Sequence, residues 1–200
     1  MKLYFTPGAC SLAPHIVLEE LGLSHELDQV DLKAKKTQSG ADFLALNAKG
    51  YVPALQLDNG HLLTEGLVIS QYLADLKPEA GLIPAAGEER YQLQSVMVFI
   101  STELHKPMGS MFNPAQSADA RQAAEATLTK RLGWIVEQLG DNDYLFANQF
   151  SIADAYLFTV LNWANIVKFD LTPWPTLAAF SARVAQRPAV QAALKAEGLI

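Results

Sequence analysis

Apolar residues recur with two different periods along this chain, and the change between them divides it into two parts. In the first part, short apolar runs alternate with stretches of helical periodicity. An Asn59-Gly60 pair separates the last two runs, which is a strong hairpin signal. The pattern predicts strands at 2–5, 26–30, 54–57 and 61–63, and helices at 11–23, 41–46 and 65–76.

This order, β-α-β-α-β-β-α, requires a parallel pair joined by a helical crossover and then an antiparallel hairpin. We therefore expect a small mixed sheet with helices on its faces, in an α/β domain over 1–77. A stretch rich in Pro and Gly, 78–88, is the expected linker.

Helical periodicity continues through 89–200, so the second domain is expected to be an all-α helical bundle. Pro107 lacks an N–H and is expected to kink the first of its helices. The predicted helices span 90–104, 118–139, 152–167, 174–186 and 189–196.

Composition narrows the class of protein. A single cysteine excludes an intramolecular disulfide, and the net charge of -6 is a poor match for nucleic acid. A small basic cluster, Lys33, Lys35 and Lys36, suits one anionic small molecule or is simply a solvated loop. The chain shows no secretory leader and no long apolar run, so we expect a cytoplasmic protein without a membrane span.

The only cysteine, Cys10, lies between the first strand and the first helix, with Ser11 as a plausible helix cap. The exposed N–H groups of a helix start favour a thiolate and predict a lowered cysteine pKa. A lone cysteine is also often a small buried hydrophobe. Position alone favours neither explanation.

Two further segments border the predicted hairpin. Pro53 precedes an apolar strand, and an ordinary trans bond is favoured because cis is the minority state. A cis bond would leave the Val52 main chain free to pair with an extended ligand. Thr64 or Glu65 is expected to cap the next helix, and the same helix start with the Glu65 carboxylate suits a zwitterion.

In the helical part, Ser151 and Asp154 form a capping-box pattern, whose loss should cost on the order of 1 kcal/mol. His105 lies beside the expected kink, where a lone histidine is usually a surface or core residue. His15, His25 and His61 are scattered without metal-ligand spacing, so no metal site is expected.

In this order the motifs resemble those of the cytosolic glutathione transferases, most closely the bacterial beta class, over the whole chain. The motifs that carry the resemblance are Pro7-Gly8-Ala9-Cys10-Ser11-Leu12, Lys49-Gly50-Tyr51-Val52-Pro53-Ala54-Leu55, Leu63-Thr64-Glu65-Gly66, Thr102-Glu103-Leu104-His105-Lys106 and Ser151-Ile152-Ala153-Asp154.

The resemblance implies a thioredoxin-like first domain, a homodimer, glutathione as co-substrate and no metal. It implies that the glycine carboxylate of glutathione meets Lys35, that its cysteinyl backbone pairs with Val52 beside a cis Pro53, and that its γ-glutamyl head lies on Glu65 and Gly66. The implied catalytic residues are Cys10, Ser11 and His105. The implied glutathione-binding residues are Cys10, Lys35, Tyr51, Val52, Pro53, Glu65, Gly66, Thr102 and His105.

Two positions depart from the class pattern. Phe5 occupies the place of a tyrosine hydroxyl, and Tyr4 cannot replace it because neighbouring strand residues face opposite ways. Val98 stands where the class often has an asparagine. We expect the first change to tune activity without abolishing it.

The leading functional prediction is conjugation of glutathione to an apolar electrophile. One alternative is a thiol-disulfide reductase or peroxidase that acts through Cys10. Another is a non-catalytic carrier of apolar ligands, or a protein-binding module. The second substrate cannot be identified from the sequence, and its pocket is expected to involve the loop after Phe5 together with Met108, Phe112 and Trp163.

Overall fold

The computed structural model describes residues 1–146 and 148–200. Its contacts form two packing units, one of Met1–Gly81 with Arg187–Ile200 and the other of Leu82–Gln186. The sequence boundaries group the last fourteen residues with the helical domain, whereas in the structure helix α9 (Pro188–Ala196) packs on helix α1 (Leu12–Glu20) of the first unit. We call the two units the sheet unit and the helical unit.

The sheet unit contains a five-stranded mixed sheet in the order β3-β2-β1-β4-β5. The strands β1 and β2 are parallel, as the intervening α1 crossover requires, and β4 and β5 form the predicted antiparallel hairpin. The short strand β3 was not predicted. The strands span β1 (Lys2–Phe5), β2 (Glu26–Asp31), β3 (Lys36–Thr37), β4 (Ala54–Gln56) and β5 (Leu62–Thr64).

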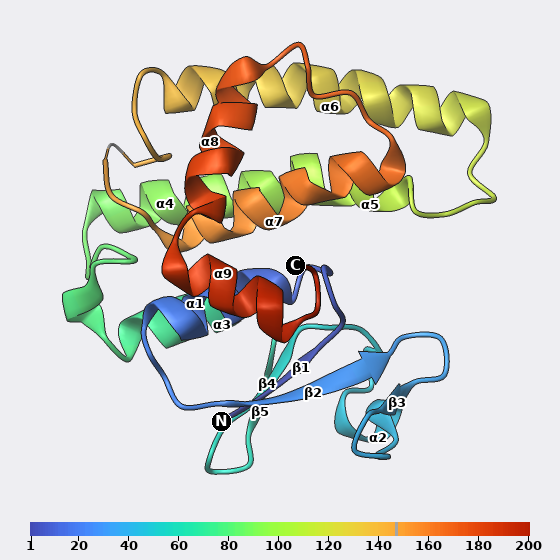
Figure 1. Ribbon diagram of the computed structural model, residues 1–200, viewed down its shortest axis with the longest axis vertical. Coiled ribbons are helices and arrows are strands. Elements are labelled where there is room, and N and C mark those ends of the chain that lie inside the picture. The colour runs from blue at the N-terminus through green and yellow to red at the C-terminus, as the bar shows by residue number, and fades with distance from the viewer. Residues whose placement is uncertain (147) are drawn as a thin grey trace. The chain divides into compact units, whose positions relative to one another are not determined.

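The two faces of the sheet bury different residues. Helices α1, α3 (Gly66–Asp75) and α9 gather on one face (Figure 1), where Phe5 of β1 lies against His15. On the other face, Tyr4 packs against Phe43 of α2 (Phe43–Leu46), in a cluster with Val52. Phe5 and Tyr4 therefore do face opposite ways, as strand alternation predicts.

The sheet topology brings three connections to one edge. Because β4 runs antiparallel to both β1 and β5, the ends of β1 and β5 lie at the same edge as the start of β4. The starts of α1 and α3 follow β1 and β5 directly. Cys10, Val52 and Glu65 are thereby placed at this shared edge.

The helical unit is built around α7 (Ile152–Val167), which is buried on nearly every side. Its apolar sequence explains this, because a helix that is hydrophobic all round belongs in a core. Ser151 and Asp154 form the predicted capping box at its start. Helix α8 (Pro175–Ala185) crosses α7 (Figure 1), while α4 (Glu88–Phe99) and α6 (Ala118–Leu139) complete the bundle.

Just before Pro107, where a kink is expected, the structure has a π-helical stretch, η2 (Ile100–His105), which leads into α5 (Lys106–Ser110). The Lys106 N–H donates to the Ser101 carbonyl five residues back. Pro107 cannot donate at all, so the usual α-helical ladder is interrupted here. Single π-turns are frequent at functional sites. A short turn, η1 (Pro78–Ala80), precedes the helical unit.

None of the helices in the described part of the chain has both the length and the apolar character needed to cross a bilayer.

Candidate functional site

The Cys10 thiol lies against the main chain at the start of β4. Its Sγ is 3.3 Å from the Val52 carbonyl oxygen, to which the thiol donates. The Val52–Pro53 bond is cis. The trans bond favoured by sequence reasoning is therefore wrong, and the cis bond implied by the resemblance is present. The intrinsic trans preference of an X-Pro bond is small, so tertiary packing decides the isomer.

The pKa of Cys10 is raised from 9.0 to about 11, mainly because burial disfavours the thiolate. The N–H groups of Cys10 and Ser11 act in the opposite direction, and the negative charge of Glu65 adds to the increase. The lowered pKa expected from the helix start is wrong, since the cost of burial exceeds the effect of the N–H groups. At neutral pH Cys10 is therefore a thiol and a hydrogen-bond donor.

Ser11 braces the loop that carries Cys10. Its side chain is fully buried, and Oγ accepts from the Thr6 N–H at 3.2 Å and donates to the Thr6 carbonyl at 3.3 Å. It occupies the cap position of α1 but makes no side-chain cap bond. The capping role expected from the sequence is therefore wrong. Its catalytic role stays a prediction, and the hydroxyl proton is committed to the loop.

Glu65 lies at the start of α3 in the left-handed region, with φ of 68°. Its carbonyl accepts from the Ile69 N–H at 2.9 Å, but its side chain makes no cap bond. Instead Oε1 accepts from Lys49 Nζ at 2.6 Å, and this pair raises the pKa of Lys49. Lys49 also donates to Thr64 Oγ1 at 2.9 Å. Sequence reasoning assigned Lys49 no role, and nothing in the local pattern signalled the pair.

Lys35, in the loop after β2, contacts the segment between Lys49 and Val52. Lys35 has φ of 55°, and its Nζ donates to the Gly50 carbonyl at 2.6 Å. Asn47 Nδ2 donates to the Tyr51 carbonyl at 2.9 Å, while the Tyr51 side chain is 48% exposed. Gly66 lies close to Pro53, because a Cβ at Gly66 would be 3.4 Å from Pro53 Cγ. The sheet unit thus brings together every site residue predicted within it.

In the helical unit, His105 Nδ1 is 2.6 Å from the Tyr156 hydroxyl, and its ring meets the edge of Trp163 with centroids 4.7 Å apart. Burial lowers the pKa of His105 to about 4, so the imidazole is neutral at pH 7. Phe112 meets Trp163 in turn, at 5.7 Å, and is itself exposed. Met108 is fully buried. Sequence reasoning did not name Tyr156 as a partner of His105.

The two remaining sequence positions are both exposed and lie four residues apart, Val98 in α4 and Thr102 in η2. Thr102 Oγ1 donates to the Val98 carbonyl at 3.1 Å, and the Val98 side chain is 53% exposed. The glutathione-binding role of Thr102 stays a prediction.

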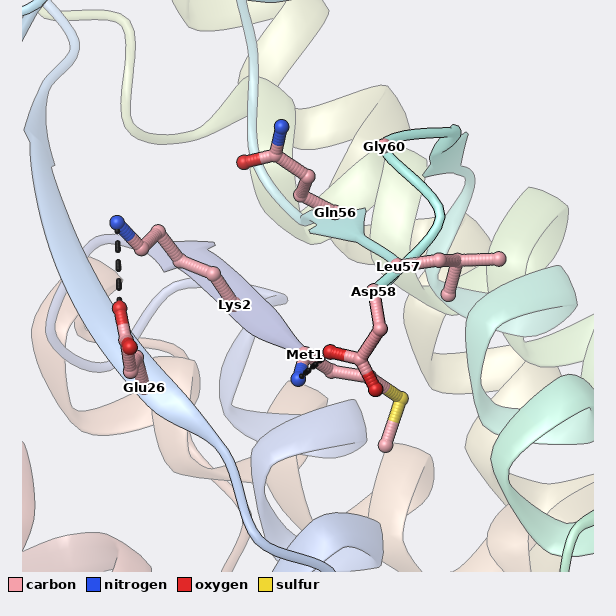
Figure 2. A pocket seen from close by; sticks show the side chains of 7 residues that line it. All are labelled: Met1, Lys2, Glu26, Gln56, Leu57, Asp58 and Gly60. Carbon is pink, nitrogen blue, oxygen red and sulfur yellow. Dashed lines mark hydrogen bonds and ion pairs between the residues drawn. The ribbon is translucent and has the colours of Figure 1, made fainter.

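A shallow cavity of about 280 Å³ lies at the other end of β1 from Cys10 (Figure 2). Its charged groups pair with one another: the Met1 amino group lies 2.7 Å from Asp58, and Lys2 lies 3.2 Å from Glu26. None of its lining residues is a predicted site residue. We therefore place the candidate site at the Cys10 edge.

Comparison with known proteins identifies the family of the chain. Residues 8–76 match the model of the glutathione S-transferase N-terminal domain, and residues 98–188 match that of the C-terminal domain. A relative named glutathione S-transferase GstA, from Escherichia coli O157:H7, is 48% identical over 200 residues, with both chains fully covered.

Two solved structures also align along the full length of both chains. One is a bacterial beta-class glutathione S-transferase from Sphingomonas chungbukensis, with a TM-score of 0.94 and 46% identity. The other is a sphingomonad glutathione S-transferase complexed with glutathione, with a TM-score of 0.95 and 46% identity. The chain therefore belongs to the glutathione S-transferase family, and its structural neighbours include the bacterial beta class.

Proposed function

We propose that this transferase conjugates glutathione to apolar electrophiles at the Cys10 edge of the sheet unit. The observation that carries the proposal is the contact between Cys10 Sγ and the Val52 carbonyl. It sets a thiol beside the main-chain segment that, by family resemblance, pairs with the cysteinyl part of glutathione. The glutathione sulfur would then lie close to Cys10.

The charged groups around this contact match the ends of the tripeptide. The Glu65 carboxylate would hold the α-amino group of the γ-glutamyl head, and the α3 start at Gly66 would hold its carboxylate. The Lys35 ammonium, already anchored on the Gly50 carbonyl, has further donors for the glycine carboxylate. Lys49 holds Glu65 in place on the exposed side.

In the proposed reaction the glutathione thiol loses its proton to solvent, its sulfur forms a bond to the electrophilic carbon, and a leaving group such as chloride departs. Holding the two reactants together and stabilising the thiolate are the tasks of the protein. Cys10 and His105 are both neutral at pH 7, because their pKa values are about 11 and about 4. We propose that they stabilise the thiolate as hydrogen-bond donors and not as charges. The Cys10 S–H would turn from the Val52 carbonyl to the glutathione sulfur, and the role of His105 at the same sulfur rests on the family resemblance.

The contact between His105 Nδ1 and the Tyr156 hydroxyl bears on which nitrogen of His105 can donate. If the Tyr156 hydroxyl donates to Nδ1, the neutral ring carries its proton on Nε2. An Nε2–H donor is what a thiolate partner requires. We therefore propose that Tyr156 positions His105 and sets its tautomer.

The raised pKa of Cys10 places thiol-disulfide chemistry second, because the thiolate is the attacking species and is scarce at neutral pH. A carrier without catalysis has no use for the Cys10 contact or for the His105–Tyr156 pair.

The test is the rate of glutathione conjugation to an activated aryl chloride, wild type against His105→Ala. We expect kcat to fall by about 100-fold, in the range typical of a positioned hydrogen-bonding or proton-transferring side chain. His61→Ala, which removes an exposed histidine from the β4–β5 hairpin, is the matched control and should keep wild-type turnover. Equal turnover of His105→Ala and wild type would remove His105 from the mechanism.

We further propose that the chain acts as a cytoplasmic homodimer. Each unit exposes large apolar side chains, including Val68 at 48% and Tyr91 at 72%, which a second copy would cover. Light scattering after size exclusion should give twice the chain mass of 21.8 kDa. A single-chain mass at micromolar concentration would refute the dimer.

A further inference from the structure

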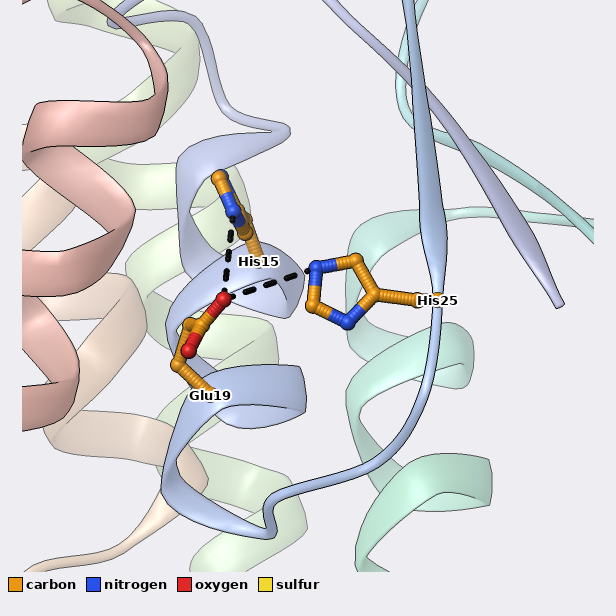
Figure 3. A group of neighbouring side chains, drawn as sticks. All are labelled: His15, Glu19 and His25. Atoms are coloured by element: carbon orange, nitrogen blue, oxygen red, sulfur yellow. Dashed lines mark ion pairs between the residues drawn. The ribbon is translucent and has the colours of Figure 1, made fainter.

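Two histidines that are scattered in the sequence meet on the helical face of the sheet unit. His15 and Glu19 lie one turn apart on α1, and His25 follows in the connection to β2. The Glu19 carboxylate oxygen lies between the two rings (Figure 3), 4.0 Å from His15 Nε2 and 3.6 Å from His25 Nε2. The three ligand atoms are within 4.8 Å of one another.

Hydrogen bonds on the far side of each ring determine where its proton lies. His15 Nδ1 is 2.8 Å from the Glu197 carboxylate, and His25 Nδ1 is 2.8 Å from the Leu23 carbonyl. An ionised carboxylate and a carbonyl can only accept, so each Nδ1 carries a hydrogen. In the neutral rings both Nε2 atoms therefore present lone pairs toward Glu19.

With neutral rings, three acceptor atoms converge here. His15 is fully buried, and its Nε2 has no hydrogen-bond partner among the described residues. A buried polar atom without a partner is costly, and lone pairs that face a carboxylate repel it. A metal ion or a proton at the centre would supply the missing partner, and three possible ligand atoms this close together fit a metal ion.

We propose that His15 Nε2, His25 Nε2 and the Glu19 carboxylate bind a divalent transition-metal ion of the Zn²⁺ class. Two imidazoles and one carboxylate, with water in a fourth position, form a common zinc ligand set. Tetrahedral bonds of about 2.0–2.1 Å require ligand atoms roughly 3.3 Å apart. Glu19 and His25 keep side-chain exposures of 29% and 11%, so they can rotate inward and leave the ion a route from solvent.

The surroundings also fit a metal site. Each ligating histidine already donates its other N–H to an acceptor, which orients the ring and raises its basicity. Glu197 additionally accepts from the Gly8 N–H at 2.8 Å, in the loop that carries Cys10. A bound ion would strengthen the His15–Glu197 bond and so hold the C-terminal segment more firmly on this loop.

The test titrates Zn²⁺ into the full-length, untagged protein, first stripped with a chelator, against a chromophoric competitor. A Cys10→Ser background removes thiol binding. We expect one ion per chain. His25→Ala and Glu19→Gln should each weaken binding by at least about tenfold. His61→Ala removes an exposed histidine outside the cluster and should bind as the parent does.

Co²⁺ and thermal unfolding provide independent measurements. Co²⁺ should give the intense visible bands of a tetrahedral site, and Zn²⁺ should raise the Tm of the parent but not of Glu19→Gln. Glu19 is partly exposed, so this variant also serves if His25→Ala fails to fold. If Zn²⁺ does not bind saturably, the metal site is refuted, and a proton on one of the Nε2 atoms would instead link the rings to Glu19. Binding that survives both cluster variants, or that is lost in His61→Ala, would refute it equally.

Discussion

The Cys10 thiol should ionise far above neutral pH, because partial burial beside the Val52 carbonyl disfavours the thiolate and the negative charge of Glu65 adds to the effect. The pKa rises from 9.0 to about 11. An increase of about 2 in the pKa corresponds to a cost of about 2.7 kcal/mol for ionising the thiol, and to roughly 100-fold less thiolate at pH 7. Alkylation at neutral pH should fall in the same proportion relative to an ordinary thiol of equal access.

The assay is the rate of iodoacetamide modification across pH, followed by intact mass. The chain has a single cysteine, so one adduct reports one site. Restricted access slows the reaction equally at every pH, whereas the pKa sets the midpoint of the profile. A free thiol in the same buffer is the control for reagent chemistry. Glu65→Gln should lower the midpoint slightly, because burial is the larger cause of the shift.

A midpoint at or below 9 would refute this reasoning. It would mean that the N–H groups at the start of α1 outweigh burial. Cys10 would then be a ready nucleophile, and thiol-disulfide exchange would become the leading reaction.

Three further predictions concern the helical unit. Asp154→Ala should lower the free energy of unfolding in urea by about 3 kcal/mol or more, because it leaves three buried donors without their acceptor: the Leu145 N–H, the Ser151 N–H and the Ser151 hydroxyl. This is larger than the cost of about 1 kcal/mol expected from the sequence for a simple cap, and a measured loss of only that size would contradict the prediction. Tyr156→Phe should lower kcat several-fold with little change in the KM for glutathione, and a change confined to KM would argue against tautomer control. The pKa of His105 falls from 6.5 to about 4 on folding, so its contribution to the free energy of unfolding is lost as pH falls through this range; the pKa of Asp154 rises from 3.8 to about 6, so its contribution is lost as pH rises. In His105→Ala only the Asp154 effect remains, and the free energy of unfolding should fall more steeply with rising pH between 4 and 6. An unchanged slope in urea titrations across this range would contradict the assignment.

The elements with strong periodicity and clear ends were predicted well from the sequence. Helices 118–139 and 152–167 have the observed bounds, because Ser117 and Ser151 begin them and Gly140 ends the first. The two-residue strand β3 was missed, since a strand this short has no periodicity. A kink was predicted at Pro107, but the π-helical stretch just before it was not, since it depends on packing that no local pattern reveals.

Sequence reasoning named the residues of the candidate site, but it did not predict their electrostatics. Local reasoning placed Cys10 at a helix start and predicted a lowered pKa. The opposite shift comes from burial, which tertiary structure creates and a sequence window cannot contain. The same holds for Lys49, whose partner Glu65 is sixteen residues away. The likeness of whole motifs to a known family supplied the roles that single residues did not.

The histidine cluster was the largest omission. His15 contacts Glu197 across 182 residues of sequence, through a terminal helix that returns to the sheet unit. His25 joins the cluster only because its connection folds back along α1. Sequence patterns detect metal ligands that lie close together on one helical turn or in one loop. Here two of the residues are on helix α1 and the third is in the connection that follows it.

Mass spectrometry of a single reaction tests the central claim most directly. Protein, glutathione and an activated aryl chloride are incubated, and both the small-molecule product and the intact protein are weighed. Conjugation predicts a glutathione thioether that has lost chloride, formed faster than without protein, and a protein of unchanged mass. A thioether yield no greater than in the protein-free reaction, or a protein that gains glutathione on Cys10 as the sole product, would contradict the proposed function.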